Sequence, residues 1–133
     1  MTLNYPLVNH DKGTYMYTYK ANVIKVVDGD TVDVDIDLGF DIHYRGRVRL
    51  YGINTPETRT RDLEEKERGL AAKARLLELC PLGSSIVLRT QKDAKGKFGR
   101  ILGMLFKTVN DEESVNQTLL HEGHAMVYGK GKT

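Results

Sequence analysis

Residues 31–37 read TVDVDID, and this stretch decides the class of fold. Its three apolar side chains share one face of an extended chain and its aspartates share the other, which is the period-two pattern of a half-buried strand. Leu-Gly-Phe at 38–40 then turns the chain, and residues 44–53 alternate again, with Val48 and Leu50 set among arginines. The two runs predict neighbouring strands of one sheet, each with one face in a core.

Three further runs have the same strand character. Upstream, residues 15–27 begin with alternating tyrosines and continue into an apolar stretch that Gly29 interrupts. Downstream, apolar runs at 85–90 and 101–106 lie on either side of a basic, glycine-containing loop at 92–99. Five short strands with period-two faces suit a small, partly open barrel of the OB type, and an α+β sandwich is the alternative.

Two helices are expected outside the strands. Asp62 resembles the cap of a helix that Pro81 ends. Ser114 and Gln117 form a capping box that opens a shorter second helix, and Gly123 stands where its C-terminal cap would be. We expect the first helix to face the core with Leu63, Leu70, Ala74 and Leu77.

The chain has 133 residues, of which 40% are apolar and 29% are charged, so we expect one globular domain. We expect residues 1–14 to form an N-terminal arm, residues 15–129 to form the barrel domain and residues 130–133 to form a tail. The predicted fold class is α+β and mainly β, with a five-stranded OB-type barrel and two helices.

Other features bear on the protein's location. No stretch approaches the roughly 20 apolar residues that span a bilayer, and the N-terminus lacks the pattern of a secretory signal. Cys80 is the only cysteine, so we interpret it as a small buried hydrophobe rather than half of a disulfide or a nucleophile. We expect a cytoplasmic monomer that makes no membrane contact.

Charges are segregated along the chain although the net charge is only +2. Acidic residues crowd the segment 28–37, and basic residues crowd 45–49 and again 89–100. Separate acidic and basic clusters in a small domain suit a metal site beside a phosphate site. The alternative is that these residues form solvated strand edges and loops.

Three segments carry the side chains that phosphodiester hydrolysis needs: VDGDT at 27–31, RLYGINTPET at 49–58 and KFGR at 97–100. A hard cation that neutralises a phosphate takes oxygen ligands. Asp30, Asn54 and the carbonyl of Thr55 supply such oxygens if the two corners meet. Each segment alone is common in turns and loops, so only the combination is informative.

The remaining requirements of this chemistry also find candidates. Arg49 and Arg100 suit phosphate binding because a guanidinium is planar, always charged and able to donate two parallel hydrogen bonds. Glu57 is the candidate for orienting or deprotonating the attacking water. Phe98 offers a ring face on which a base can stack.

With these motifs, the chain resembles the staphylococcal (micrococcal) nuclease family. That family has a strand ending in Asp-Gly-Asp-Thr, an arginine five residues before an Asp-Thr-Pro-Glu corner, and a Lys-Tyr-Gly-Arg motif, and the resemblance runs from about Tyr17 to Tyr128. It implies an OB barrel with helices. It also implies a Ca²⁺-dependent nuclease that cuts DNA and RNA with limited sequence preference and leaves 3′-phosphates.

The resemblance further implies a role for each matching residue. Asp30 and the Thr55 carbonyl are the implied Ca²⁺ ligands, and Glu57 handles the attacking water. Arg49 and Arg100 hold the phosphate, and Arg100 also assists departure of the 5′ oxygen. The implied nucleic-acid contacts are Lys97, Phe98 and Tyr128.

The chain also departs from the family pattern. Asn54 stands where the family has a metal-binding aspartate, and its amide oxygen lacks the charge, so we expect weaker metal binding or a shifted metal preference. The family has a third helix, whereas this chain ends at Thr133, and the family's pocket tyrosine is one position away from Tyr128. The alternative function is therefore a nuclease-fold module that binds nucleic acid or a protein partner with little or no cleavage. A weaker alternative is a DNA-processing accessory that cuts only within a complex.

Overall fold

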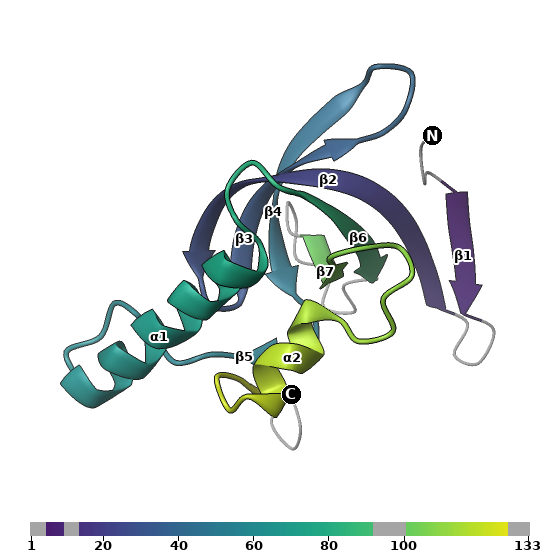
Figure 1. Ribbon diagram of the computed structural model, residues 1–133. Coiled ribbons are helices and arrows are strands. Elements are labelled where there is room, and N and C mark those ends of the chain that lie inside the picture. Colours follow the sequence, from purple (N-terminus) through teal and green to yellow (C-terminus); the bar gives the residue numbers. More distant parts are fainter. Residues whose placement is uncertain (1–4, 10–13, 92–100, 128–133) are drawn as a thin grey trace.

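A computed structural model describes residues 5–9, 14–91 and 101–127. Along the chain the elements are β1 (Tyr5–Asn9), β2 (Thr14–Asp28), β3 (Thr31–Asp37), β4 (His43–Leu50), β5 (Ile53–Asn54), α1 (Leu63–Leu79), β6 (Ser85–Gln91), β7 (Ile101–Phe106), α2 (Val115–His121) and β8 (Met126–Val127) (Figure 1). Neither helix within these ranges has the length and apolar character needed to cross a membrane.

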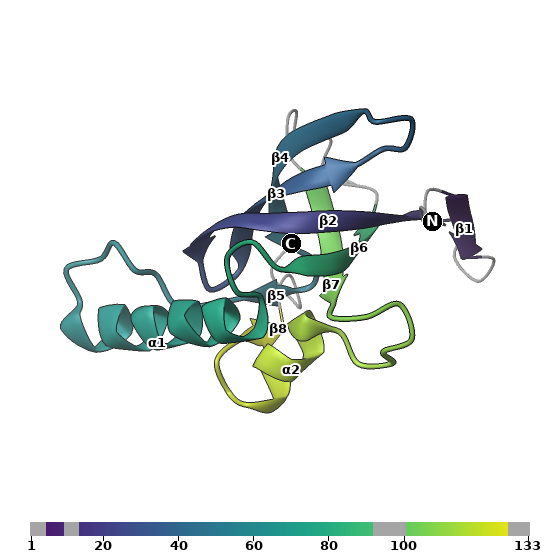
Figure 2. The same ribbon diagram turned by 45° about the horizontal axis from the view of Figure 1, so that its top comes forward.

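Five strands close into a barrel in the order β2-β3-β4-β7-β6, with β6 returning to β2 (Figures 1 and 2). Neighbours are antiparallel except β4 and β7, which run parallel with Val48 opposite Ile101. β2 closes the barrel because its 15 residues are enough for two partners, so that Ala21 pairs with Ile36 of β3 and with Ile86 of β6. The predicted five-stranded OB-type barrel with two helices is confirmed.

Two details of the strands differ from expectation. Within the predicted arm, β1 forms an antiparallel pair with the start of β2, and it lies outside the barrel (Figure 1). The predicted strand at 44–53 is two elements, because Tyr51 and Gly52 form a turn in which Gly52 has φ +83°. That positive φ suits glycine, and the turn sends β5 away from the barrel to pair with β8.

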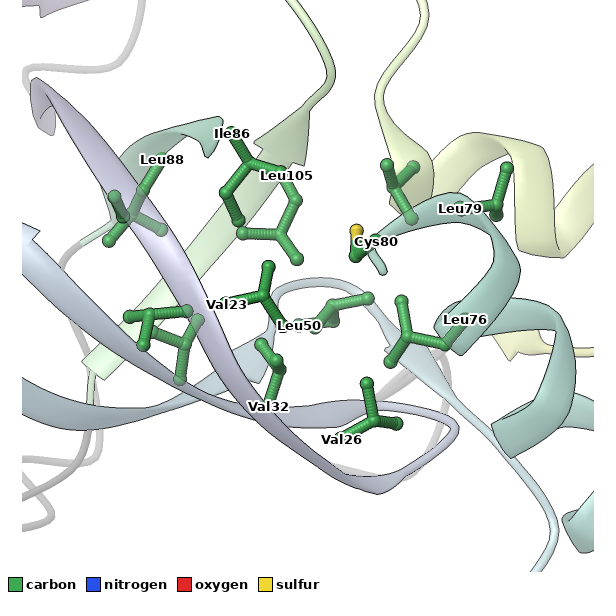
Figure 3. Packing of buried hydrophobic residues seen from close by; sticks show 14 of the residues in the cluster. Val23, Val26, Val32, Leu50, Leu76, Leu79, Cys80, Ile86, Leu88 and Leu105 are labelled. Carbon is green, nitrogen blue, oxygen red and sulfur yellow. The ribbon is translucent and has the colours of Figure 1, made fainter. Parts of the chain in front are cut away.

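The barrel interior is the core, and the alternating stretch at 31–37 is confirmed as one of its walls. Val32, Val34 and Ile36 are 0%, 0% and 3% exposed, while the alternate side chains of β3 are half-buried on the outer face. Leu76 of α1 joins Val23, Val26, Val32 and Leu50 at one end of the barrel (Figure 3). The predicted burial of Cys80 is also confirmed.

The predicted core face of α1 was wrong. Leu63, Leu70 and Leu77 are 76%, 47% and 41% exposed, and Ala74 is exposed as well. The buried residues of α1 are instead Gly69, Ala72, Leu76 and Leu79.

Close approach of the backbone explains this face of α1. A Cβ atom built on Gly29, in the turn between β2 and β3, would lie 2.7 Å from the Cβ of Ala72. At Gly69 and Ala72 the helix therefore approaches the rest of the chain through small residues, while Leu76 and Leu79 on the same face pack into the core. The predicted cap was right: Asp62 accepts hydrogen bonds from the backbone N–H groups of Glu64 and Glu65.

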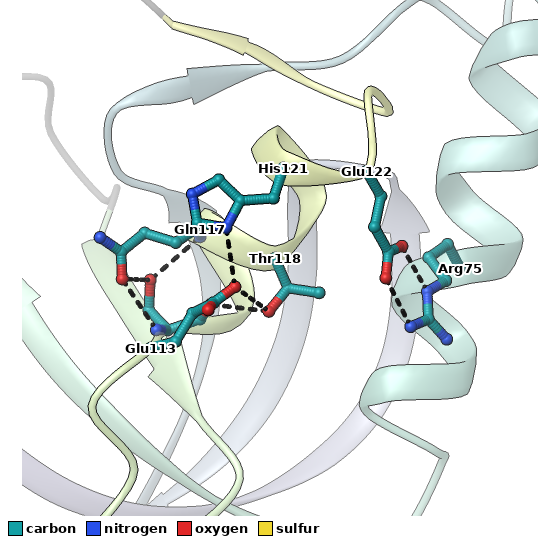
Figure 4. A network of polar contacts seen from close by, with 7 residues as sticks. Arg75, Glu113, Gln117, Thr118, His121 and Glu122 are labelled. Carbon is teal, nitrogen blue, oxygen red and sulfur yellow. Dashed lines mark hydrogen bonds and ion pairs between the residues drawn. The ribbon is translucent and has the colours of Figure 1, made fainter.

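A polar clamp joins the two helices (Figure 4). Arg75 of α1 donates to both carboxylate oxygens of Glu122 at the end of α2, at 2.7 and 2.8 Å. These charged hydrogen bonds hold the pKa of Glu122 below its ordinary value. At the opposite side of α2, Glu113 accepts from the hydroxyl of Thr118 and contacts the ring of His121 at 3.1 Å. The Arg75–Glu122 pair thus ties the end of α2 to α1.

Candidate active site

The two acidic corners predicted from the sequence do meet. Asp30 is 9% exposed, and its Oδ2 accepts a hydrogen bond from the backbone N–H of Thr55 at 3.1 Å. Its Oδ1 accepts from the hydroxyl of Thr31 at 2.9 Å. Asp28 accepts from the hydroxyl of Thr58 at 2.7 Å. Both carboxylates of the Asp-Gly-Asp segment therefore hold the 55–58 corner against the turn between β2 and β3.

Arg49 connects this corner to β4. Its Nη1 donates to the carbonyls of Leu50 and Ile53 at 3.0 and 2.9 Å, so the guanidinium spans the turn after β4. Its Nη2 donates to Oδ1 of Asn54 at 2.8 Å, and its Nη1 lies 3.6 Å from Oδ2 of Asp30. The Arg49 side chain is only 18% exposed. The structure thus places Asp30, Arg49, Asn54 and Thr55 in a single network.

Glu57 lies at the exposed edge of the same corner. Its backbone N–H donates to Oε2 of Glu65 on α1 at 3.1 Å, which ties the corner to the helix. Gly69 allows this contact, because a Cβ atom there would lie 2.5 Å from the carbonyl oxygen of Glu57. Sequence reasoning missed Gly69. Its signal was a glycine inside a helix, where it costs about 1 kcal/mol relative to alanine unless packing requires it.

The oxygen atoms at this corner fit a hard divalent cation. They are the Asp30 carboxylate, the Asn54 amide oxygen and the oxygens of Thr55, whose hydroxyl is buried and has no hydrogen-bond partner among the described residues. Within residues 14–91 and 101–127 no group of three or more His, Cys, Asp and Glu side chains could hold a metal. A site with few carboxylates suits an ion that keeps waters and takes substrate oxygens, rather than a closed zinc site.

A family model for staphylococcal nuclease homologues matches residues 47–133, which is more than half of the chain. This chain belongs to the staphylococcal nuclease family. It is 35% identical to an uncharacterized protein of Methanocaldococcus jannaschii, across 83% of this chain and 59% of that one. It is 34% identical to the SPbeta prophage-derived endonuclease YokF of Bacillus subtilis, across 77% of this chain and 32% of the relative. It is 32% identical to endonuclease YncB of the same organism, across 77% and 45%. This family member thus spans about a third to three fifths of these relatives.

Four predicted site residues lie outside the described part of this family member: Lys97, Phe98, Arg100 and Tyr128. Phosphate binding by Arg100 and the nucleic-acid contacts of Lys97, Phe98 and Tyr128 therefore stay predictions, as does phosphate binding by Arg49. The basic cluster at 45–49 is partly paired with carboxylates. Arg47 donates to both carboxylate oxygens of Asp33 at 2.8 and 3.2 Å, which lowers the pKa of Asp33. Within that cluster, Arg49 is the arginine whose guanidinium faces the Asp30 corner.

Asn116 is a further residue that organises this site from a distance. It is 3% exposed and lies on α2, where its Nδ2 donates to the carbonyls of Tyr51 and Gly103 at 2.9 and 3.2 Å. Its Oδ1 accepts from the backbone N–H of Leu105 at 3.2 Å. The amide therefore anchors the turn that Arg49 spans. The sequence carries no clear signal for this role, because Asn116 stands among other polar residues of the short helix.

Proposed function

We propose that this chain is a divalent-metal-dependent nuclease that hydrolyses phosphodiester bonds in DNA or RNA with little sequence preference. The observation that carries the proposal is the network of Asp30, Arg49, Asn54 and Thr55, in which oxygen atoms of the kind that bind a hard cation lie beside a largely buried guanidinium. The similarity to proteins named endonucleases supports the same reaction class.

Each described residue has a distinct part in the proposed site. Asp30, the Asn54 amide oxygen and the Thr55 carbonyl would hold the cation, with Ca²⁺ the expected ion. When bound, the cation supplies charge neutralisation at the phosphate. Arg49 binds phosphate oxygens and stabilises the negative charge that grows on them during attack. Because its carbonyl partners fix it before substrate arrives, little reorganisation is needed at the moment of reaction.

Glu57 orients or deprotonates the attacking water, and its exposed position at the corner leaves room for that water. The water oxygen bonds to phosphorus and the bond from phosphorus to the 5′ oxygen breaks. One product carries a 3′-phosphate, and the other carries a 5′-hydroxyl whose proton derives from the water. Arg100 is proposed to assist departure of the 5′ oxygen.

Digestion of single-stranded DNA, duplex plasmid and RNA tests the proposal, with Ca²⁺, Mg²⁺, Mn²⁺ or a chelator present. We expect cleavage with a divalent ion and none with chelator. Arg49→Lys keeps the charge but loses the two-pronged geometry, so turnover should fall on the order of 10²-fold. Arg47→Lys is the matched control on the same strand and should cleave at the parental rate. Full cleavage in chelator would refute the metal requirement.

A substitution at Asn54 tests the proposed metal site directly. Asn54→Asp adds a negative charge beside Asp30, and ligand charge is a main control on Ca²⁺ affinity. Part of that charge will be neutralised by Arg49, which already contacts the side-chain oxygen at 2.8 Å. We therefore expect tighter Ca²⁺ binding by calorimetry, with a larger gain before nucleotide is added than after. Equal affinities without nucleotide would remove residue 54 from the ligand set. Nucleic-acid binding without cleavage in either protein would favour the non-catalytic module.

A further inference from the structure

A second opening lies beside the candidate active site. It is a cleft of about 700 Å³ between β7, α2 and the segment that joins them. Tyr51 and Gly52, in the turn that Arg49 spans, form one wall, and Met104 and Phe106 contribute apolar surface. Arg89 of β6 reaches into the same cleft. Its lining therefore includes a cation, aromatic rings and part of the proposed catalytic turn.

Strand register places this cleft on the same outer face of the barrel as Arg49. Arg49 is opposite Leu102 in the parallel pair, and Met104 is opposite Arg89 in the antiparallel pair. Directly opposed residues share a face, and so do residues two apart on one strand. The path from Arg49 to Arg89 crosses two strand spacings, from β4 to β7 and from β7 to β6, and runs two residues along β7. The Cα atoms of Arg49 and Arg89 are therefore roughly 12 Å apart.

The guanidinium of Arg89 has few partners within the described part of the chain. Its carbon Cζ lies 4.6 Å from the centre of the Phe106 ring, and its Nη2 makes one long hydrogen bond, 3.4 Å, to the carbonyl of Val109. Its Nε is buried with no hydrogen-bond partner there. None of the described carboxylates forms an ion pair with it, although Asp111 and Glu112 line the same cleft. An arginine held over a ring and short of acceptors is suited to bind an anion.

We propose that the cleft binds a further phosphate and base of the same nucleic-acid strand, with Arg89 on the phosphate and Tyr51 under the base. The proposal rests on the proposed function, since it assigns a longer substrate to that site. At about 3.4 Å of rise per nucleotide, a strand that stays stacked spans 12 Å in three to four nucleotides. Tyr51 is 42% exposed, and a base that is free of a duplex can stack on its ring. The preferred substrate is therefore single-stranded and longer than about four nucleotides.

The acidic residues of the cleft allow an anionic ligand to be distinguished from a cationic one. Asp111 accepts hydrogen bonds from the backbone N–H and the hydroxyl of Thr108, so its carboxylate belongs to its own turn. Glu112 makes no such contact among the described residues. If the cleft takes an anion, neutralising Arg89 must weaken binding and neutralising Glu112 must strengthen it. A cationic peptide in the cleft would give both changes the opposite sign.

Fluorescence anisotropy with a labelled oligothymidylate of about eight nucleotides measures this binding. A Glu57→Gln background prevents cleavage of the probe. Arg89→Gln should weaken binding on the order of tenfold. It should also reduce the slope of log affinity against log salt by about 0.7, the contribution of one phosphate contact on a single strand. Arg89→Lys should restore the slope, and Arg68→Gln, on α1 outside the cleft, should leave the affinity unchanged.

Two further measurements complete the test. A dinucleotide has a single internucleotide phosphate, which the cleavage site would occupy, so Arg89→Gln should not change its affinity or its turnover in the cleaving enzyme. Tyr51→Ala should weaken binding of the longer strand roughly five- to hundredfold, and Tyr51→Phe should keep it. Thermal denaturation shows whether each variant is folded. If Arg89→Gln does not fold, Arg89→Lys and Glu112→Gln still show whether the cleft binds an anion or a cation.

The outcomes separate this proposal from the proposed function. Strand binding that depends on Arg89, with no cleavage under any metal, would leave the cleft assignment standing and refute the nuclease. Cleavage that is normal while Arg89→Gln leaves the salt slope and the length dependence unchanged would refute the cleft assignment alone. Binding that tightens in Arg89→Gln would also overturn it.

Discussion

Gly69→Ala is a small substitution that should report on the alignment of Glu57. In a helix interior alanine is more favourable than glycine by about 1 kcal/mol, so propensity alone predicts a stabler protein. The structure predicts otherwise, because the new Cβ would lie 2.5 Å from the carbonyl oxygen of Glu57 and 2.7 Å from that of Pro56. Ordinary contact begins at 3.4 Å and real Cβ atoms stay beyond 3.0 Å, so the helix and the corner must separate by roughly 0.5 to 0.9 Å.

That movement sets the size of the expected changes in stability and in turnover. Overpacking typically costs about 1–3 kcal/mol, which offsets the gain in propensity and leaves a net loss of about 0–2 kcal/mol. Catalytic groups tolerate about 0.5 Å of displacement, and a misplacement of about 1 Å can cost on the order of 10²-fold in rate. We therefore expect turnover to fall by between about tenfold and a hundredfold while the protein stays folded.

Initial cleavage rates and chemical denaturation measure the two effects separately, and the amide resonance of Glu57 reports the displacement directly. Ala71→Gly is the matched control, since Ala71 is exposed on the same helix. It should lose about 1 kcal/mol and keep its cleavage rate. If Gly69→Ala is stabilised by about 1 kcal/mol with an unmoved Glu57 amide, α1 does not press on the corner and the reasoning is wrong.

Three further predictions concern other parts of the molecule. Burial raises the pKa of the Cys80 thiol to about 11, so iodoacetamide should modify it only after unfolding; stoichiometric labelling of the folded protein would contradict this. Thr58→Val removes the hydroxyl that donates to Asp28 and should lower the free energy of unfolding by about 1 kcal/mol, measured in urea. An unchanged urea midpoint would mean that water fully replaces this hydrogen bond. Arg47→Met should return the pKa of Asp33 toward its ordinary 3.8, measured by NMR titration. Because that pKa is lowered in the folded state, the pair's contribution is complete above the ordinary value and is lost as pH falls through the folded value.

The strands were predictable because period two is a direct consequence of backbone geometry. The alternation at 31–37 identified Val32, Val34 and Ile36 as core residues, and all three are buried. Closure of the barrel depends on β2 pairing with both β3 and β6, a long-range property that no local pattern encodes. The face of α1 was mispredicted for a related reason. Close backbone approach at Gly69 and Ala72 sets the rotation of the helix, so that Leu76 and Leu79 are buried, and a pattern of apolar side chains does not register a glycine as part of the buried face.

In the candidate site too, the identity of single residues could be predicted, whereas the contacts between them could not. Chemistry pointed to Asp30, Arg49 and Asn54 as individual residues, because few side chains can bind a hard cation or a phosphate. The hydrogen bonds that join them could not be read from spacing. In particular, the bond between Arg49 and Asn54 depends on the turn at Tyr51 and Gly52, which the sequence presented as the end of a continuous strand.

That turn also explains why the site depends on residues far from it. Arg49 holds the turn from the barrel side through the carbonyls of Leu50 and Ile53, and Asn116 holds it from α2 through the carbonyl of Tyr51. α2 is in turn fixed to α1 by Arg75 and Glu122, and α1 carries Gly69 against the Glu57 corner (Figure 4). The carboxylate proposed to handle the water, Glu57, and the guanidinium proposed to bind the phosphate, Arg49, are therefore positioned by one closed chain of contacts. Loosening any link should change the distance between them before it unfolds the barrel, because the links lie outside the apolar core.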